Sequence, residues 1–193
     1  QWGMGGAYDL DRFEYTPVAD ADGQPPPPPL LAVVSPLRLN HSTNILSLIR
    51  LHDPSTHAFL PAEQWAMVGA VPFDAVLRTG ANRSATGCNR VRVHQPSQRA
   101  IFSCFGTSTE GDDIVGFVDI ADPAAPKLIS TTPFVSQQPT GMLVVGDALF
   151  VAGELDIMAF DMRAPKPTPP LVATCGSACV HVGHARAQNF HSV

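Results

Sequence analysis

The sequence predicts an all-β fold built from short antiparallel strands that are grouped in repeated units. Three observations support this prediction. The 193-residue chain contains 19 prolines and 15 glycines, which interrupt helices and mark turns. Its apolar runs are about five to seven residues long, the length of a strand rather than a helix. One proline-marked pattern also occurs three times along the chain, as a repeat architecture requires.

The repeated pattern ends one strand with aspartate and proline and then begins another. Residues 119–129, DIADPAAPKLI, align with residues 161–172, DMRAPKPTPPLV, at a separation of 42 to 43 residues. A weaker copy, RLHDPSTHAFL, spans residues 50–60. Proline has no backbone N–H for a sheet ladder, so Asp-Pro ends the third strand of each unit. The later proline then directs the chain into an outer edge strand.

A strand–turn–strand hairpin precedes each of the two stronger copies. Residues 88–106, CNRVRVHQPSQRAIFSCFG, have turn chemistry at residues 95–98 between two apolar strands. Residues 141–153, GMLVVGDALFVAG, repeat this design with a tight turn at Gly146-Asp147. Each copy then adds a third strand and, after its prolines, an outer strand. The pattern therefore predicts four antiparallel strands in about 43 residues.

Four-stranded sheets in series indicate a β-propeller, in which neighbouring blades bury each other's apolar faces around a central axis. We place the units at residues 6–65, 86–132 and 139–175, with a partial fourth at 178–193, in a single propeller-like domain spanning 1–193. The first and second copies are 69 residues apart, so residues 61–85 are expected to be an insertion. Three units and the start of a fourth make an incomplete ring. Either the chain is cut short or partner copies complete it.

The stretches GFVDIADPAAPKLI and ALFVAGELDIMAFDM resemble the LVIVD-type repeat of bacterial and algal secreted β-propellers. In that family a hairpin precedes a strand that ends in Asp-Pro, and a further proline leads into the outer strand. The resemblance covers residues 86–175 well and residues 30–60 poorly. The chain departs from the family pattern at Arg50 and Ala164, where aspartate is expected. The resemblance implies an architecture and little chemistry.

Composition and charge argue against two classes of partner. The net charge of −5 and the scattered positions of the twelve Lys and Arg residues provide no basic surface for nucleic acid. Apolar runs such as Leu30–Val34 are far shorter than the roughly 20 residues that cross a bilayer, so no membrane insertion is expected. Catalytic and phosphate-binding motifs are also missing from the sequence. We therefore expect no catalytic residue, no cofactor and no metal site.

Four cysteines suggest disulfides and hence an oxidising compartment. Cys88 and Cys104 flank the predicted hairpin. They face each other if its loop has three residues or a bulge, whereas a strict two-residue turn pairs Cys88 with Phe105. Cys175 and Cys179 are the second candidate pair and would close a very small loop. Buried free thiols are the alternative for the first pair, and a zinc site with nearby histidines is the alternative for the second.

Two glycosylation acceptors also favour an extracellular or cell-surface location, and a run of five prolines is a further candidate for docking or modification. Asn40 and Asn82 each begin an Asn-x-Ser acceptor for N-linked glycans, and unmodified loop asparagines are the alternative. The run of five prolines at residues 25–29 is expected to form an extended polyproline II segment. It is either a stiff loop, a docking ligand or a hydroxylated and glycosylated segment. The candidates for docking or modification are Pro25, Pro26, Pro27, Pro28 and Pro29.

Together these features predict a non-catalytic extracellular module with a structural or interaction role. We expect one subunit of a surface or fibrous glycoprotein assembly, held by self-association or by other protein chains through blade edges and faces. The alternative is a fragment of a propeller enzyme that acts on carbohydrate or another small substrate. Converging carboxylates or histidines at the channel mouth would favour the enzyme. Covered blade edges would favour the assembly.

Overall fold

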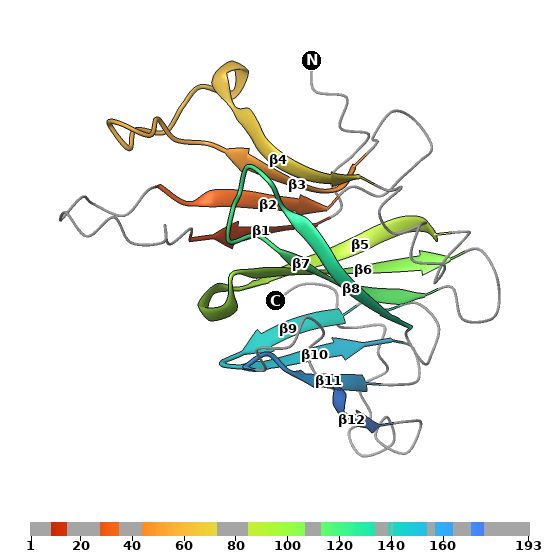
Figure 1. Ribbon diagram of the computed structural model, residues 1–193. Coiled ribbons are helices and arrows are strands. Elements are labelled where there is room, and N and C mark those ends of the chain that lie inside the picture. The colour runs from red at the N-terminus through yellow and green to blue at the C-terminus, as the bar shows by residue number, and fades with distance from the viewer. Residues whose placement is uncertain are drawn as a thin grey trace.

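The structure is a computed structural model that describes residues 9–14, 28–34, 44–72, 85–106, 113–133, 139, 141–153, 157–163 and 171–175. Within these ranges the strands form three four-stranded antiparallel sheets, which lie one above another in Figure 1. This confirms the all-β class and the prediction of four-stranded antiparallel sheets, whereas the predicted partial fourth unit, 178–193, lies outside the described residues. No helix in the described part of the chain is long and apolar enough to span a membrane.

Each sheet is a meander in which consecutive strands are neighbours. The first sheet contains β1 (Asp9–Phe13), β2 (Leu30–Val34), β3 (Asn44–Arg50) and β4 (Ala66–Pro72). The second contains β5 (Ala85–His94), β6 (Arg99–Gly106), β7 (Ile114–Asp119) and β8 (Lys127–Pro133). The third contains β9 (Gly141–Val145), β10 (Ala148–Ala152), β11 (Ile157–Asp161) and β12 (Leu171–Cys175). Two short 3-10 helices, η1 (Ala62–Gln64) and η2 (Gln95–Ser97), lie in connections.

The second sheet is the middle layer and is buried on both faces. On β6, Phe102 belongs to the core shared with the first sheet, whereas its neighbour Ile101 belongs to the core shared with the third. The ring of Phe117 on β7 meets Phe160 of the third sheet edge to face, with 5.4 Å between ring centroids. Successive side chains of a strand point to opposite faces, so a strand between two sheets must be apolar throughout. This explains the unbroken apolar run of β7.

The aspartates of the repeated pattern end the third strand of a sheet by capping the turn that follows it. In each case a carboxylate oxygen accepts the backbone N–H two residues later, which is an Asx turn. The pairs are Asp119 with Ala121 (2.9 Å), Asp161 with Arg163 (3.0 Å), Asp122 with Ala124 (3.0 Å) and Asp53 with Ser55 (2.8 Å). The three sequence copies therefore share a capping function, even though no copy except the middle one keeps both aspartates.

One boundary of the first unit was predicted wrongly. β4 lies within residues 61–85, the expected insertion, yet it is the outer strand of the first sheet and pairs with the whole of β3. Residues 58–60, which follow the Asp-Pro pattern, make a single bridge between His52 and Phe59. Seven residues of β3 offer a long edge, and only a run of similar length can satisfy its donors and acceptors. The remainder of the expected insertion, residues 73–84, lies outside the described residues.

Candidate interaction site

Neighbouring sheets meet at their first strands, β1, β5 and β9, and polar side chains gather there. β5 contacts β1 and β2 on one side and β9 on the other. In Figure 1 β1 lies at the lower edge of the first sheet, next to β5, and β9 lies at the upper edge of the third sheet. Each is also an edge strand, because its sheet continues only through its second strand. Its outward backbone N–H and C=O groups therefore need partners from a neighbouring sheet or from solvent.

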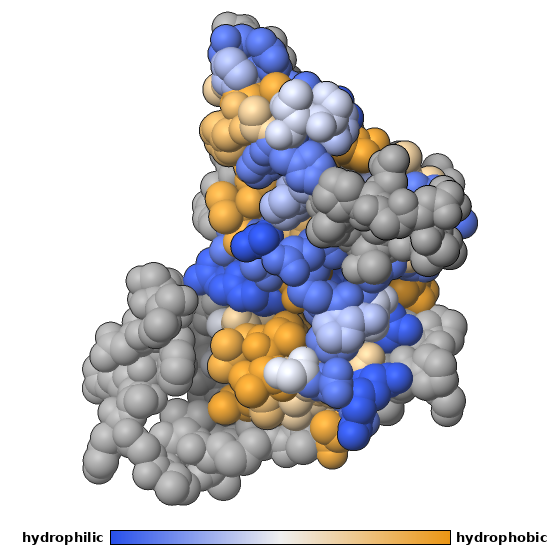
Figure 2. Space-filling view, turned by 90° about the vertical axis from the view of Figure 1, so that its left-hand side faces the viewer, coloured by the Kyte–Doolittle hydropathy of each residue, from blue (hydrophilic) through white to orange (hydrophobic). Residues whose placement is uncertain are grey.

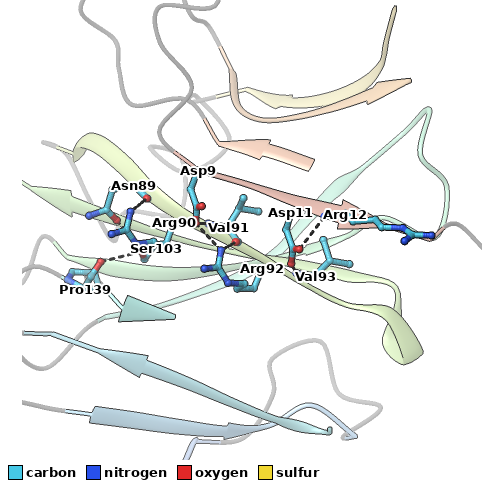
Figure 3. A network of polar contacts seen from close by, with 10 residues as sticks. All are labelled: Asp9, Asp11, Arg12, Asn89, Arg90, Val91, Arg92, Val93, Ser103 and Pro139. Atoms are coloured by element: carbon cyan, nitrogen blue, oxygen red, sulfur yellow. Dashed lines mark hydrogen bonds and ion pairs between the residues drawn. The ribbon is translucent and has the colours of Figure 1, made fainter. Parts of the chain in front are cut away.

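Two carboxylates of β1 supply partners to the edge of β5. Val91 N–H donates to Asp9 Oδ2 over 3.1 Å, and Val93 N–H donates to Asp11 Oδ2 over 2.8 Å. Both pairs are 82 residues apart in sequence. A constant offset shows that β1 and β5 run in the same direction, with side chains replacing the missing ladder between them (Figure 3).

The contacts of β1 with β5 continue on either side of these two bonds. Arg92 Nη1 lies 2.7 Å from Asp9 Oδ2 in an ion pair whose side chains are 28% and 20% exposed. Beyond the end of β5, Gln95 Oε1 accepts the Glu14 N–H over 2.9 Å, and its Nε2 donates to the Arg12 carbonyl over 2.7 Å. Since Asp9 and Asp11 are both engaged by β5, they hold two sheets together rather than forming a free acid–base pair.

A smaller polar cluster joins the second and third sheets. The hydroxyl of Ser103, which is fully buried, lies 3.0 Å from Asn89 Oδ1 and 3.1 Å from the carbonyl oxygen of Pro139. Pro139 precedes β9 by two residues. Buried hydroxyls are costly unless they are hydrogen-bonded, so this bond anchors the start of β9 against β6 (Figure 3).

The predicted disulfide between Cys88 and Cys104 is present and fully buried. The hairpin loop contains four residues between His94 and Arg99, and from there to Arg90 the register is the one that pairs Cys88 with Phe105. A β-bulge between Cys88 and Arg90 shifts the register by one residue and brings the two cysteines opposite each other. Asn89 is the extra residue, so the bulge that aligns the cysteines also presents the partner of the buried serine.

His94 makes a contact that the sequence did not reveal. It is 2% exposed, with Nδ1 2.7 Å from Ser97 Oγ and Nε2 3.3 Å from Asp147 Oδ1. Serine, histidine and aspartate in contact also occur in nucleophilic catalysis. Here the serine lies three residues after the histidine within the same turn, and the aspartate belongs to the β9–β10 turn. The contact therefore closes one hairpin and ties it to the next sheet.

The third sheet differs from the second because one of its two faces is free. Toward the second sheet, Leu149, Val151 and Phe160 are fully buried. The opposite face exposes alternating residues of three strands, which we call the outer face. Its exposed fractions are 57% for Leu143, 56% for Val145, 39% for Phe150 and 39% for Ile157. In Figure 2 one of the hydrophobic patches lies on the lower half of the molecule, at the level of the third sheet.

Phe150 lies at the centre of the outer face. The strand registers place it opposite Leu143 on one side and Ala159 on the other. The neighbouring cross-strand rows are Val145, Ala148 and Asp161, and Gly141, Ala152 and Ile157. Eight of these nine positions are therefore uncharged and mostly apolar. Of the nine large hydrophobic residues that are exposed in the described part of the chain, six belong to the third sheet.

A charged turn borders the outer face at Asp161. The side chain of Arg163 donates to both carboxylate oxygens, over 2.9 Å and 2.7 Å. This side-chain hydrogen bonding, together with the Arg163 backbone N–H, lowers the pKa of Asp161 to about 2. The same contact raises the pKa of Arg163. In the corresponding turn of the first sheet, hydrogen bonds from Ser55 and Thr56 hold the pKa of Asp53 well below its usual range.

Several predicted site residues are not brought into this arrangement. Pro28 and Pro29 lead directly into β2 and are partly exposed, and Cys175 is the last residue of β12. The candidates that lie outside the described residues are Asn40, Asn82, Cys179, Pro25, Pro26 and Pro27. Among the residues that the structure does describe, no group of three His, Cys, Asp or Glu is placed to hold a metal ion.

No protein-family model matches the chain, and no curated protein shows significant sequence similarity to it.

Proposed function

We propose that the chain is a non-catalytic, propeller-like interaction module of an extracellular assembly. The observation that carries this proposal is the outer face of the third sheet, a mostly apolar surface with Phe150 at its centre and one charged residue, Asp161, at its border. Large contiguous apolar patches on the surface of a protein commonly mark interaction sites.

The order of the sheets supports the propeller-like part of the proposal. In a propeller, the first strands of successive blades run in the same direction around the axis and the meanders extend outward. β1 and β5 run in parallel, linked through Asp9 and Asp11, and β9 follows on the other side of β5. Each sheet also buries its apolar face against the next one along the chain. The resemblance to LVIVD-type repeats agrees with this arrangement.

The extracellular part of the proposal is supported by the disulfide between Cys88 and Cys104, because stable disulfides form mainly in oxidising compartments. The acceptor patterns at Asn40 and Asn82 fit the same location. The intact mass of the native material, measured with and without deglycosylation and reduction, tests this directly. We expect glycan mass and at least one disulfide. A bare polypeptide of 20.5 kDa with four free thiols would refute the location.

The contacts of the first strands argue against the enzyme alternative. In a propeller enzyme, side chains from these strands would line the channel in which the substrate binds. The carboxylates of Asp9 and Asp11 both accept hydrogen bonds from the backbone of β5, and Asp9 also pairs with Arg92. Glycoside hydrolysis needs two carboxyl groups that are free to give and take protons. Within the described residues, these two serve the contact between sheets instead.

The interaction function is tested on native material recovered from the source of the protein. Size-exclusion chromatography under non-denaturing conditions should place the wild-type chain in a complex larger than the monomer that the same material gives after denaturation. Phe150→Glu should release it, because a carboxylate buried without a partner opposes association. Val172→Glu is the matched control, since Val172 is 61% exposed on β12, away from the centre of the face. A wild-type chain that elutes as a monomer, unchanged by Phe150→Glu, would refute the function.

A further inference from the structure

We propose that the Asp-Pro turn of the second sheet is the element that docks this sheet onto the first, and that Gly69 on β4 is the position that receives it. We call residues 122–126, DPAAP, the docking turn. The sequence pattern indicates that this motif ends one strand and directs the chain into the next. The contacts around Gly69 add a second role, recognition between neighbouring units. This contact lies within the chain, so it is independent of what binds the outer face of the third sheet.

Gly69 has no room for a side chain because the docking turn lies directly against it. A Cβ added at Gly69 would lie 2.7 Å from Pro126 Cδ, 3.2 Å from the backbone carbon of Ala124, and closer still to the carbonyl oxygen of Pro123. Two of these three atoms belong to the backbone, so no change of rotamer relieves the contact. A glycine within a strand often marks such a close approach of another backbone. In Figure 1 the connection from β7 to β8 reaches the level of the first sheet.

The docking turn is held in shape by its own hydrogen bonds. The carboxylate of Asp122 accepts the Ala124 N–H over 3.0 Å, and the carbonyl oxygen of Asp122 accepts the Ala125 N–H over 3.1 Å. The φ angles of Pro123 and Pro126 are fixed by their rings. A rigid turn loses little conformational entropy when it docks. Pro123 is buried although the residues on either side of it are exposed, so the turn presents this proline to the first sheet.

The corresponding turn of the first sheet shows that capping alone does not bury the proline. Asp53 accepts the Ser55 N–H over 2.8 Å, which is the same bond that caps the docking turn. Pro54 is nevertheless exposed, whereas Pro123 is buried. The two turns share the Asp-Pro motif and the capping bond. Burial of Pro123 therefore comes from the contact at Gly69 and not from the capped turn itself.

The receiving position holds a small residue in each of the three sheets. A β-bulge interrupts the pairing of the third strand with the outer strand at the same place in every sheet. The outer-strand residues directly after the bulged position are Gly69, Ser130 and Ala173. These belong to the three smallest residue types. Ser130 Oγ is buried, so this position on the second sheet is covered as well.

Gly69→Ala tests the docking, because the two possibilities predict shifts of opposite sign. Alanine is the better strand residue, so a Gly69 that receives nothing should give a variant with a higher urea midpoint. We expect a lower midpoint, since overpacking against the docking turn outweighs the strand preference. In native-state hydrogen exchange, the Ala124 and Ala125 amides should exchange about tenfold faster. The Ser55 amide, which is capped in the same way in the first sheet, is the internal control and should be unchanged.

Two proline variants complete the experiment. Pro126→Ala removes the ring carbon near the added Cβ, so Gly69→Ala should lower the midpoint less in this background than in the wild type. Pro54→Ala, at an exposed proline, is the matched control and should leave the effect of Gly69→Ala unchanged. A midpoint raised by Gly69→Ala, or equal coupling to both prolines, would overturn the docking role.

A variant that does not fold leaves a second measurement. If Gly69→Ala cannot be purified in folded form, Pro126→Ala alone should speed the exchange of the docking-turn amides more than Pro54→Ala speeds that of Ser55. Equal changes in the two turns would show that the prolines only shape their own turns, and the docking role would then be wrong.

Discussion

A close contact between two strands of the second sheet, at Gly116, gives a sharp test of the packing. Gly116 on β7 lies opposite Phe102 on β6, whose ring is fully buried. A Cβ added at Gly116 would lie 2.5 Å and 2.6 Å from Phe102 Cε1 and Cε2, and closer still to Cζ. An ordinary contact is 3.4 Å or longer, so the ring would have to recede by about 1 Å.

Gly116→Ala should therefore destabilise the protein, because Phe102 is enclosed by the core between the first and second sheets and has no space to move into. Overpacking a well-filled core costs about 1–3 kcal/mol. The better strand conformation of alanine recovers about 0.5–1 kcal/mol. The added Cβ would overlap three atoms of the Phe102 ring, which places the overpacking cost near the upper end of its range. The net loss is then about 2 kcal/mol, which lowers the urea midpoint by roughly 0.8 M at a slope of about 2.5 kcal/mol per molar.

The assay is urea unfolding followed by circular dichroism, with two further variants. Gly141→Ala is the matched control, because the nearest atom to its added Cβ is Ala152 Cβ at 3.2 Å, and it should change the stability by less than about 0.5 kcal/mol. Phe102→Leu combined with Gly116→Ala should recover about 1 kcal/mol in a double-mutant cycle. A Gly116→Ala variant as stable as the control, or a cycle with no coupling, would refute the packing described for this pair.

Three further predictions concern the contacts that hold the sheets and turns. Asp11→Ala leaves the Val93 N–H without its acceptor and should lower the free energy of unfolding, measured in urea, by about 1–3 kcal/mol. The control is Arg12→Ala, which removes an exposed ion pair and should cost less than about 1 kcal/mol. Equal effects of the two variants would argue against the hydrogen bond between Asp11 and Val93. Reducing the Cys88–Cys104 disulfide, which spans 16 residues, should cost about 3 kcal/mol, and an unchanged urea midpoint with reductant would contradict this. NMR titration should give Asp161 a pKa of about 2, moving toward 3.8 in Arg163→Ala. Because the pKa of Asp161 is lower in the folded state than in the unfolded state, its stabilising contribution is present above pH 3.8 and is lost as the pH falls toward 2. If the pKa of Asp161 is the same in Arg163→Ala, Arg163 is not the cause of the low value.

The strands of the second and third sheets were predictable from local signals. Gly146 has the positive φ of 56° that a tight turn requires, and the predicted hairpin at Gly146-Asp147 is present between β9 and β10. Asp119 ends β7 by accepting the Ala121 N–H, and Asp122 caps the turn that follows by accepting the Ala124 N–H, so each bond spans only two residues. Such features depend on neighbours in sequence, so the pattern of residues is enough to find them.

The candidate site was less predictable, because its contacts join residues far apart in the chain. No residue next to Asp9 or Asp11 in sequence indicates that their carboxylates accept hydrogen bonds from residues 82 positions later. The cysteine alignment was left open for a related reason. The loop length at residues 95–98 does not decide it, since a bulge at Asn89 changes the register beyond the turn.

By itself the amino-acid sequence determined the strand class, the turn positions and the grouping of four strands, because alternation, proline and Asx capping act over a few residues. Only the tertiary structure decided that β4 completes the first sheet, that Cys88 faces Cys104, and which apolar face stays free. The physical reason is that a strand such as β10, ALFVA, is apolar on both of its faces, so the alternation of side chains does not indicate which face is covered. Which face is covered depends on the sheet that packs against it, and that sheet is built from residues elsewhere in the chain.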